Sequence, residues 1–326
     1  MLPDLDLSEV ALLARSMTWK FAWLNLPIAG AKSGIRFDPQ APGRDAVIDA
    51  FAEAVRPFVA SGQYIAGADM GTSYDDVVRI RAKAGQPVGK MPLGQKLRRG
   101  LAMEELVTGY GVVQAAAEAG AFLGRPLAGA TVALEGFGKV GAGCMLALRD
   151  EGARLVAVST LRGTRHDPNG LNVDELFELR GVCGDEAVTR YERGRLFPRQ
   201  ALYSLPADVL IPGARTHCIT ADVARSVEAK LVVPAANAPL TAEAEEIVSG
   251  RGGTVVPDFI ANAGGVLLEM VDSAGGGEEE AFRTTRERVR ANTRRVLEES
   301  QARGETPPRT AVVMARQWLR EHCETL

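Results

Sequence analysis

Apolar residues recur at helical spacing in two stretches near the start of the chain. Residues 8–23 predict a helix that begins at Ser8, with Glu9 near its positive end. Residues 43–60 carry the same period, and Pro57 is expected to interrupt that helix. The segments after these helices, LNLPIAGAKSGIRFDP and YIAGADMGTSYDD, contain Gly and Pro breakers and predict loops with short strand portions.

Strands and helices alternate in the second part of the chain. Ser73 or Thr72 is expected to cap a third helix, and an irregular stretch separates this helix from a region that begins near residue 105. Residues 107–124 predict a helix, and residues 130–160 predict strand, glycine turn, helix and strand, which is one βαβ unit. Short apolar strands follow in ADVLIPG, KLVVPAAN and GTVVPDFIANAGG, with helices between them. This alternation predicts an α/β fold with a parallel, doubly wound sheet of the Rossmann type.

Two helices are expected to end the chain. From residue 276 the pattern is helical and charged, which favours a solvated amphipathic helix. A last helix is predicted in PRTAVVMARQWLREHC.

Composition narrows the class of protein. A chain of 326 residues suits two domains, and a formal net charge of −3 without a long run of one sign gives no support for a nucleic-acid partner. The four cysteines form no CxxC pair and the three histidines show no metal-ligand spacing, so we expect no metal site and a cytoplasmic location. The N-terminus does not resemble a signal peptide, and no apolar run of about 18 residues predicts a membrane span.

A glycine-rich turn follows the strand TVALE. It has the pattern G-x-G-x-x-G between a strand and a helix, where the glycines allow a pyrophosphate to approach the backbone and the helix N-terminus. The alternative is an ordinary glycine turn. The candidate cofactor-binding residues in this turn are Gly136, Phe137, Gly138, Lys139, Val140 and Gly141.

The second strand of the βαβ unit bears on the choice of nucleotide. It ends at Ser159 and Thr160, without the carboxylate that usually holds the ribose of NAD. Arg162 and Arg165 follow, and hydroxyls with arginines suit a 2′-phosphate, so these residues favour NADP or use of both nucleotides. The alternative is that the two arginines are simply solvated.

Two lysines, Lys20 and Lys32, occur in the small and apolar segment MTWKFAWLNLPIAGAKSGIR. Either one alone would most simply be a surface lysine. Together with the segments YIAGADMGT, VTGYGVV, VALEGFGKVG, ADVLIPGA, ANAPLT and VPDFIANAGGV, in this order, they resemble the glutamate/leucine/phenylalanine/valine dehydrogenases. The resemblance covers nearly the whole chain and implies interconversion of an L-amino acid with its 2-oxo acid and ammonia.

The resemblance implies a role for each matching residue. Lys20 would bind the substrate α-carboxylate, Lys32 would be the catalytic lysine, and Asp69, in GADMG, would carry a proton to and from the amino group. Burial and a neighbouring ammonium both lower the pKa of a lysine, so Lys20 is expected to help Lys32 act as a base. The residues expected near the nicotinamide are Thr108, Asn237 and Asn262, of which Asn262 also belongs to a segment that closes over the substrate.

Two features depart from the family pattern. A strand that ends in a GPxxGG(I/V)R-like motif usually precedes the MTWK segment, so the N-terminus is expected to be shortened. The position three residues beyond Val266 lines the substrate side-chain pocket in the family, and here it is Glu269. A carboxylate there would repel a glutamate side chain and attract a basic one. The alternative is that Glu269 faces the surface or pairs with an arginine.

The prediction is therefore an NAD- or NADP-dependent amino acid dehydrogenase with glutamate as the first candidate substrate. A branched-chain, aromatic or basic amino acid is the first alternative, and a non-catalytic regulatory paralogue is the second. We expect a substrate-binding and oligomerisation domain at residues 1–106 and a nucleotide-binding domain at 107–290, with substrate in the cleft between them. The C-terminal helix, about residues 291–326, is expected to pack on the first domain, and the protein to form a homo-oligomer.

Overall fold

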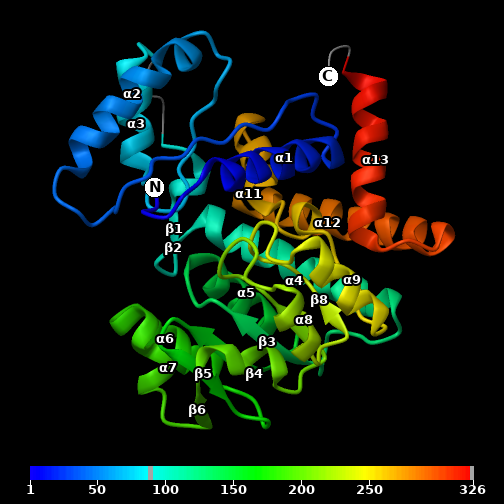
Figure 1. Ribbon diagram of the computed structural model, residues 1–326. Coiled ribbons are helices and arrows are strands. Elements are labelled where there is room, and N and C mark those ends of the chain that lie inside the picture. The colour runs from blue at the N-terminus through cyan, green and yellow to red at the C-terminus, as the bar shows by residue number, and fades with distance from the viewer. Residues whose placement is uncertain (87–90, 324–326) are drawn as a thin grey trace. The chain divides into compact units, whose positions relative to one another are not determined.

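The computed structural model describes residues 1–86 and 91–323 (Figure 1). The chain divides into two compact units, and each is described by itself. Unit 1 consists of Met1–Phe21 and Ile28–Met91, and unit 2 consists of Ala22–Pro27 and Pro92–Leu326. The domain boundaries expected near residues 106 and 290 stay a prediction.

The described residues of unit 1 form α2 (Arg44–Ala60), α3 (Tyr74–Lys83) and all but the last two residues of α1 (Leu7–Trp23). Helices α2 and α3 lie side by side (Figure 1) around a small apolar core. As predicted, Ser73 caps α3, since its hydroxyl accepts the Asp76 N–H while the Asp76 carboxylate accepts the Ser73 N–H at 2.7 Å. This local exchange of hydrogen bonds explains why the start of α3 could be predicted.

Two expectations for unit 1 are wrong. Helix α2 is not interrupted by Pro57, because the proline lies in its last turn, where the helix ends three residues later and little is lost. The loop segments around residues 24–39 and 64–70 form no strand among the described residues of the unit. The pairing present is a single bridge between Leu2 and Arg36, and an extended segment needs a longer partner to become a strand.

Unit 2 is built on a seven-stranded sheet of order β6-β5-β4-β3-β7-β8-β9. Strand β3 pairs in parallel with β4 and β7, and β7, β8 and β9 are also parallel. The α/β fold with a doubly wound sheet is therefore confirmed. The strands are β3 (Thr131–Glu135), β4 (Arg154–Thr160), β5 (Gly163–His166), β6 (Arg195–Phe197), β7 (Val209–Ile211), β8 (Leu231–Val232) and β9 (Thr254–Val255).

An antiparallel edge was not predicted. Strands β5 and β6 extend the sheet beyond β4 with antiparallel pairing. Only residues 161–162 separate β4 from β5, and a connection this short cannot hold the crossover that a parallel strand requires. The sheet is consequently mixed.

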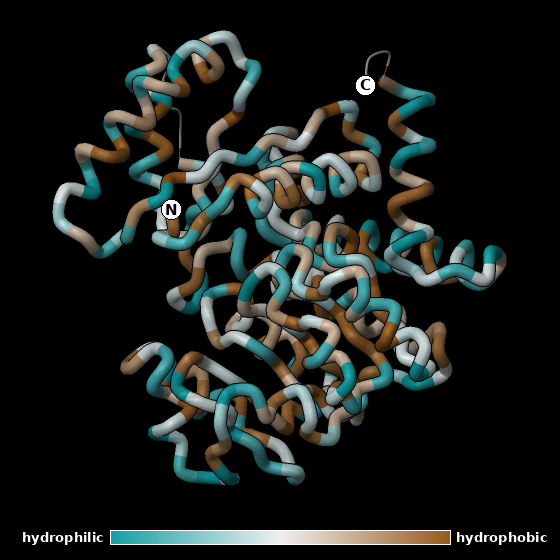
Figure 2. Tube along the Cα trace, viewed as in Figure 1, coloured by the Kyte–Doolittle hydropathy of each residue, from teal (hydrophilic) through white to brown (hydrophobic). Residues whose placement is uncertain are grey.

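Helices cover the sheet and form the rest of unit 2. Hydrophobic colour concentrates inside this unit and hydrophilic colour on its outer helices (Figure 2). Helix α4 crosses α5 closely, because a Cβ at Gly109 would lie 2.4 Å from the Cys144 nitrogen. The helices of unit 2 are α4 (Met103–Phe122), α5 (Lys139–Asp150), α6 (Val173–Cys183), α7 (Ala187–Arg190), α8 (Ala221–Ser226), α9 (Ala242–Gly250), α10 (Asp258–Ala261), α11 (Gly264–Ser273), α12 (Glu278–Arg303) and α13 (Pro307–His322). A small hairpin, β1 (Leu97–Arg98) with β2 (Leu101–Ala102), precedes α4.

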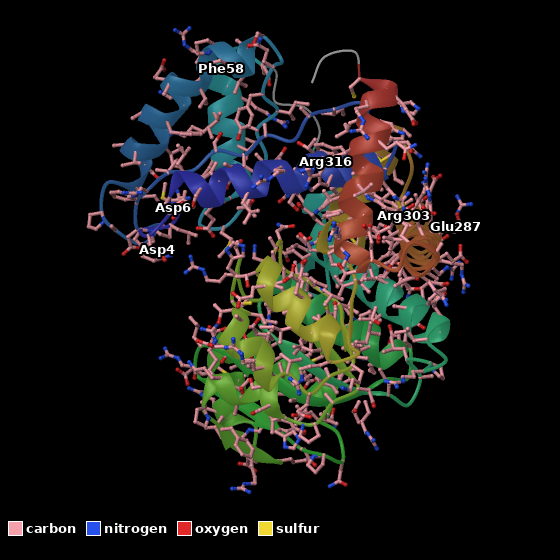
Figure 3. The ribbon with its side chains drawn as sticks, turned by 45° about the vertical axis from the view of Figure 1, so that its right-hand side comes forward. Asp4, Asp6, Phe58, Glu287, Arg303 and Arg316 are labelled. Atoms are coloured by element: carbon pink, nitrogen blue, oxygen red, sulfur yellow. The ribbon has the colours of Figure 1, made fainter. Side chains whose placement is uncertain are left out.

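The long helix α12 is amphipathic, as expected. Its buried residues recur every three or four positions, while Glu287 and Arg303 on α12 and Arg316 on α13 are exposed (Figure 3). Among the helices formed by residues 1–86 and 91–323, none combines the length and hydropathy needed to cross a bilayer.

Candidate active site

Lys32 and Asp69 meet in unit 1. The Lys32 Nζ donates to Asp69 Oδ2. The Lys32 side chain is 23% exposed to solvent and the Asp69 side chain 48%. The Asp69 loop is fixed locally, since the Thr72 hydroxyl accepts the Asp69 N–H at 2.9 Å and donates to the Asp69 carbonyl at 2.8 Å. Asp69 Oδ1 also accepts the Met70 N–H at 2.8 Å. Two loop residues far apart in sequence are thus held as an acid–base pair.

The charge state of Asp69 follows from its surroundings. Burial acts to raise the pKa of its carboxyl group. The Lys32 ammonium and the Met70 N–H outweigh that effect and hold the pKa below its usual value. Asp69 is therefore an anion near neutral pH and can accept a proton.

The loop that carries Lys32 packs tightly on α1, the helix that carries Lys20. The Gly30 N–H donates to Thr18 Oγ1 at 3.0 Å, and a Cβ at Gly30 would lie 2.2 Å from the Ala14 carbonyl oxygen. Only glycine fits at this contact. Lys20, in the last turn of α1, is buried with 5% of its surface exposed. The segments MTWK and AGAK are therefore neighbours in unit 1.

The glycine turn of unit 2 lies at the end of β3, between its neighbours β4 and β7. Gly136 has a φ of 85° and donates its N–H to the Ser159 carbonyl at 3.0 Å. A Cβ at Gly141 would lie 2.0 Å from the Gly136 oxygen, whereas a Cβ at Gly138 would meet no atom within 4 Å. The first contact is a packing requirement, but the open space at Gly138 is what a close-lying ligand needs.

The end of β4 also fits a dinucleotide. The Ser159 side chain is 1% exposed, and its hydroxyl has no hydrogen-bond partner among residues 1–86 and 91–323. A buried hydroxyl without a partner is costly, and a ribose hydroxyl or phosphate oxygen could satisfy it. Because this group lies beside the turn, unit 2 has the features of a dinucleotide site at the switch point of its sheet.

The other polar residues near Ser159 are already engaged. Thr160 Oγ1 donates to the Asp185 carbonyl at 2.9 Å and accepts the Arg162 N–H at 3.1 Å. Arg162 pairs with Glu186 at 2.8 Å. Arg165 is buried and donates to backbone carbonyls, so it is not the phosphate-facing arginine that the sequence suggested.

The residues expected near the nicotinamide come together at another part of unit 2. Asn262 Nδ2 donates to Asn237 Oδ1 at 3.1 Å and to the carbonyl of Ala236 at 3.2 Å. Helix α11 starts against α4, since a Cβ at Gly265 would lie 3.2 Å from Thr108 Oγ1. Thr108, Asn237 and Asn262 thus belong to one region of close backbone packing.

Strained backbone marks the same region. Ala238, directly after Asn237, has a φ of 45°, which non-glycine residues rarely adopt. Its N–H donates to Asp258 Oδ2 at 2.9 Å, and its carbonyl accepts the N–H of His217, which has a φ of 53°. Such strain persists where surrounding contacts fix the loop, and it concentrates at functional sites.

Val266 and Glu269 lie three residues apart on α11, and Glu269 is exposed while Val266 is partly buried. Leu267 and Leu268 between them are buried and anchor the helix. Residues three apart share one side of a helix, so Val266 and Glu269 can face the same ligand. Their role in substrate binding stays a prediction.

Sequence reasoning missed Glu135, the residue before the glycine turn. Its carboxylate is 1% exposed and accepts hydrogen bonds from the Tyr203 hydroxyl and from Cys218 Sγ at 3.2 Å, with an Arg199 Nη2 at 3.5 Å. Burial, followed by the Glu135 carboxylate, raises the pKa of the Cys218 thiol to about 12. The available signal was a lone carboxylate at the end of the apolar strand TVALE.

Comparison with protein families decides what these two units are. The family described as Glu/Leu/Phe/Val dehydrogenase, dimerisation domain, matches residues 1–84, and the family described as Glutamate/Leucine/Phenylalanine/Valine dehydrogenase matches residues 100–323. The chain belongs to the glutamate/leucine/phenylalanine/valine dehydrogenase family. It is an amino acid dehydrogenase of that family, as the resemblance in its sequence predicted.

Individual relatives agree with this membership. The chain is 37% identical to the glutamate dehydrogenase of Thermotoga maritima over 279 residues, which cover 83% of this chain and 67% of the relative. It is 34% identical to an NAD-specific glutamate dehydrogenase of Staphylococcus aureus, covering 92% of this chain and 75% of the relative. It is 32% identical to an NADP-specific glutamate dehydrogenase of Halobacterium salinarum, covering 88% and 70%.

A solved structure also resembles the whole chain. The hetero-hexameric glutamate dehydrogenase of Thermus thermophilus, in a form described as Leu-bound, superposes with a TM-score of 0.84 at 28% identity. The superposition covers 98% of this chain and 79% of that one. Family and fold therefore agree over both units.

Proposed function

We propose that this chain is a glutamate dehydrogenase that interconverts L-glutamate with 2-oxoglutarate and ammonia, using NAD or NADP. The contact between Lys32 Nζ and Asp69 Oδ2 carries this proposal, because the reaction needs paired groups that accept and release protons. Relatives named as NAD-specific and as NADP-specific glutamate dehydrogenases support both the substrate and the choice of nucleotides.

The residues of unit 1 would handle the protons. Bound NAD or NADP supplies the hydride acceptor, and that transfer requires positioning and exclusion of water. Asp69, an anion near neutral pH, takes a proton from the substrate ammonium group. Lys32 has by then given its ammonium proton to solvent. After hydride leaves Cα, water adds to the resulting iminium carbon and gives a proton to the neutral Lys32 amine. Collapse of that adduct releases ammonia and the 2-oxo acid.

Lys20 would bind the substrate rather than react with it. Its ammonium can pair with the α-carboxylate, which every amino acid substrate carries. The resemblance at MTWK and the place of Lys20 on α1, beside the loop that carries Lys32, support this role. Thr108, Asn237 and Asn262 would hold the nicotinamide end of the cofactor, and Val266 with Glu269 would face the substrate side chain.

The chain would act as a homo-oligomer in the cytoplasm. The family that matches residues 1–84 is described as a dimerisation domain, and the Thermus relative is described as hetero-hexameric. All four cysteines are free, which fits a reducing compartment. Light scattering coupled to size exclusion tests the assembly, and a monomeric mass across the concentrations used for activity would contradict it.

A reductive amination panel tests the reaction. The protein receives ammonia, NADH or NADPH, and either 2-oxoglutarate or a branched-chain, aromatic or basic 2-oxo acid. We expect oxidation of the nucleotide to be fastest with 2-oxoglutarate. A faster rate with another 2-oxo acid would reassign the substrate, and no turnover despite nucleotide binding would indicate the regulatory paralogue.

A pair of lysine variants tests the chemical role. Lys32→Ala should lower kcat by about 100-fold to 10,000-fold, the usual contribution of a positioned acid–base group, and should keep its affinity for NADH. Lys83→Ala is the matched control, because Lys83 also belongs to unit 1 and also contacts carboxylates. Its partners are Asp49 at 3.4 Å and Glu53 at 3.5 Å, both on α2 and not in the Asp69 loop. Control-like rates in Lys32→Ala would refute the proposed role.

A further inference from the structure

Helix α6 brings an arginine to the glycine turn. Arg180 Nε donates to the backbone carbonyl of Phe137 at 2.7 Å, and the guanidinium carbon lies 5.9 Å from the centroid of the Phe137 ring. Phe137 is the second residue of GFGKVG, and its ring is buried with 2% exposed. The guanidinium is therefore held at the turn by two contacts to one residue of that turn.

Most of the donors of Arg180 are left over. A guanidinium has five N–H groups, and the contact to Phe137 uses the single one on Nε. Within residues 1–86 and 91–323, the Nη groups of Arg180 have neither a hydrogen-bond nor an ion-pair partner. By contrast, Arg165 uses all three of its nitrogens and Arg162 pairs with Glu186.

The charges around Arg180 leave room for an anion. Burial lowers the pKa of Arg180, and the carboxylates of Glu105 and Asp185 offset only part of that effect. Glu105 is already engaged, because its carboxylate contacts Lys139 Nζ at 2.9 Å and accepts the Ala102 N–H at 3.1 Å. Arginine stays charged in any case, and a partly buried cation with unused donors favours an anionic ligand.

We propose that Arg180 binds a phosphate group of the dinucleotide through its Nη groups. The inference rests on the proposed cofactor and adds a residue that lies outside the glycine motif. The phosphate could be the diphosphate at the start of α5 or the 2′-phosphate of NADP at the end of β4. Arg180 contacts the glycine turn directly. It also lies within electrostatic range of Asp185, whose carbonyl accepts the Thr160 hydroxyl at the end of β4. Both phosphate positions are therefore near Arg180.

Binding measurements with three ligands test the proposal without relying on turnover. Isothermal titration of the full chain with NADH, NADPH and adenosine compares the wild type with Arg180→Met and Arg180→Lys. Arg193→Met is the matched control. Arg193 lies outside α6 but pairs at 3.1 Å with Glu175, which is on α6 like Arg180, and this pair does not involve the glycine turn. Adenosine carries no phosphate and reports on the nucleoside part of the site alone.

Arg180→Met should lower the affinity for NADPH by about 10-fold to 100-fold, which is the loss expected when charge-assisted hydrogen bonds are removed. An equal loss for NADH assigns the contact to the diphosphate, and a loss confined to NADPH assigns it to the 2′-phosphate. Arg180→Lys should recover part of the affinity, because it keeps the charge but not the planar fork. Adenosine affinity should stay at the wild-type value throughout.

Three results would overturn the proposal. One is nucleotide affinity in Arg180→Met within about two-fold of the wild type. Another is a parallel loss of adenosine affinity, which would show that Arg180 only supports the fold. The third is a wild type that binds neither nucleotide. A thermal midpoint of Arg180→Met below that of Arg193→Met would mean that the methionine variant is destabilised. In that case the nucleotide and adenosine affinities of Arg180→Lys, compared with those of the wild type, decide the proposal by the same criteria. Absence of turnover with intact nucleotide binding would contradict the proposed function alone.

Discussion

The hydrogen bond between Tyr203 and Glu135 should be a strong contributor to the stability of unit 2. Glu135 is 1% exposed and Tyr203 7%, and the phenol donates directly to the carboxylate. Burial, followed by the Glu135 charge, raises the pKa of Tyr203, so the phenol remains a donor at every pH at which the protein is handled. A hydrogen bond to a charged group contributes about 1.5–3 kcal/mol, so Tyr203→Phe should cost about 2 kcal/mol.

Removal of the acceptor should cost more. Glu135→Leu leaves the Tyr203 hydroxyl and the Arg199 guanidinium without the carboxylate, and breaking a buried charged contact costs about 3–5 kcal/mol. The double variant should be about as unstable as Glu135→Leu alone, because the hydroxyl then has no acceptor left to lose. The coupling energy should therefore be about 2 kcal/mol.

Urea unfolding, followed by circular dichroism at one protein concentration, measures all four proteins of this cycle. Tyr64→Phe is the control, since the Tyr64 hydroxyl has no hydrogen-bond partner within residues 1–86 and 91–323, and it should shift stability by less than about 0.5 kcal/mol. If the double variant loses the sum of the two single losses to within about 0.5 kcal/mol, the hydroxyl and the carboxylate act independently and the reasoning fails.

Two further predictions concern Glu245 and Gly138. Burial, then the charges of Asp258 and Glu246, raise the pKa of Glu245 from 4.5 to about 8, so the folded state keeps a proton that the unfolded state releases. The free energy of unfolding should therefore decline between about pH 5 and pH 8. In thermal melts Glu245→Gln should flatten this decline, whereas Glu243→Gln, at an exposed position, should not. An unchanged dependence of stability on pH in Glu245→Gln would contradict the shift. Gly138→Ala should keep the melting temperature, because a Cβ at this position meets no atom within 4 Å. The same variant should lower the affinity for NADH by about 10-fold in titrations. Unchanged affinity would mean that the nucleotide does not approach this glycine.

Features set by local sequence were predictable. The cap at Ser73 uses a partner three residues away, and the turn at Gly136 needs a positive φ directly after a strand. The pairing of Lys32 with Asp69, thirty-seven residues apart, came from the family resemblance. No local pattern would have brought these two loops together, because each alone is compatible with an exposed position.

Features set by distant partners were not predictable. Glu135 became interpretable only once Tyr203 and Cys218, from later segments, were seen around its carboxylate. Arg165 fits a phosphate-binding arginine by its place in the sequence, but the fold turns it inward to the carbonyl of Val188. The surroundings of a side chain on β5 depend on which distant segments pack against that strand, and periodicity does not encode that.

The end of β4 shows how the fold sharpens a sequence-based choice. Ser159 and Thr160 are equivalent candidates in the sequence, because both hydroxyls end the same strand. In the fold, the turn between α6 and α7 brings the Asp185 carbonyl within 2.9 Å of the Thr160 hydroxyl, which uses its proton there, while Ser159 Oγ has no hydrogen-bond partner among residues 1–86 and 91–323. A ribose would therefore be recognised through Ser159, and any preference for a 2′-phosphate would need a cation from another element. Arg162 is committed to Glu186, so Arg180 on α6 is the better source of that charge.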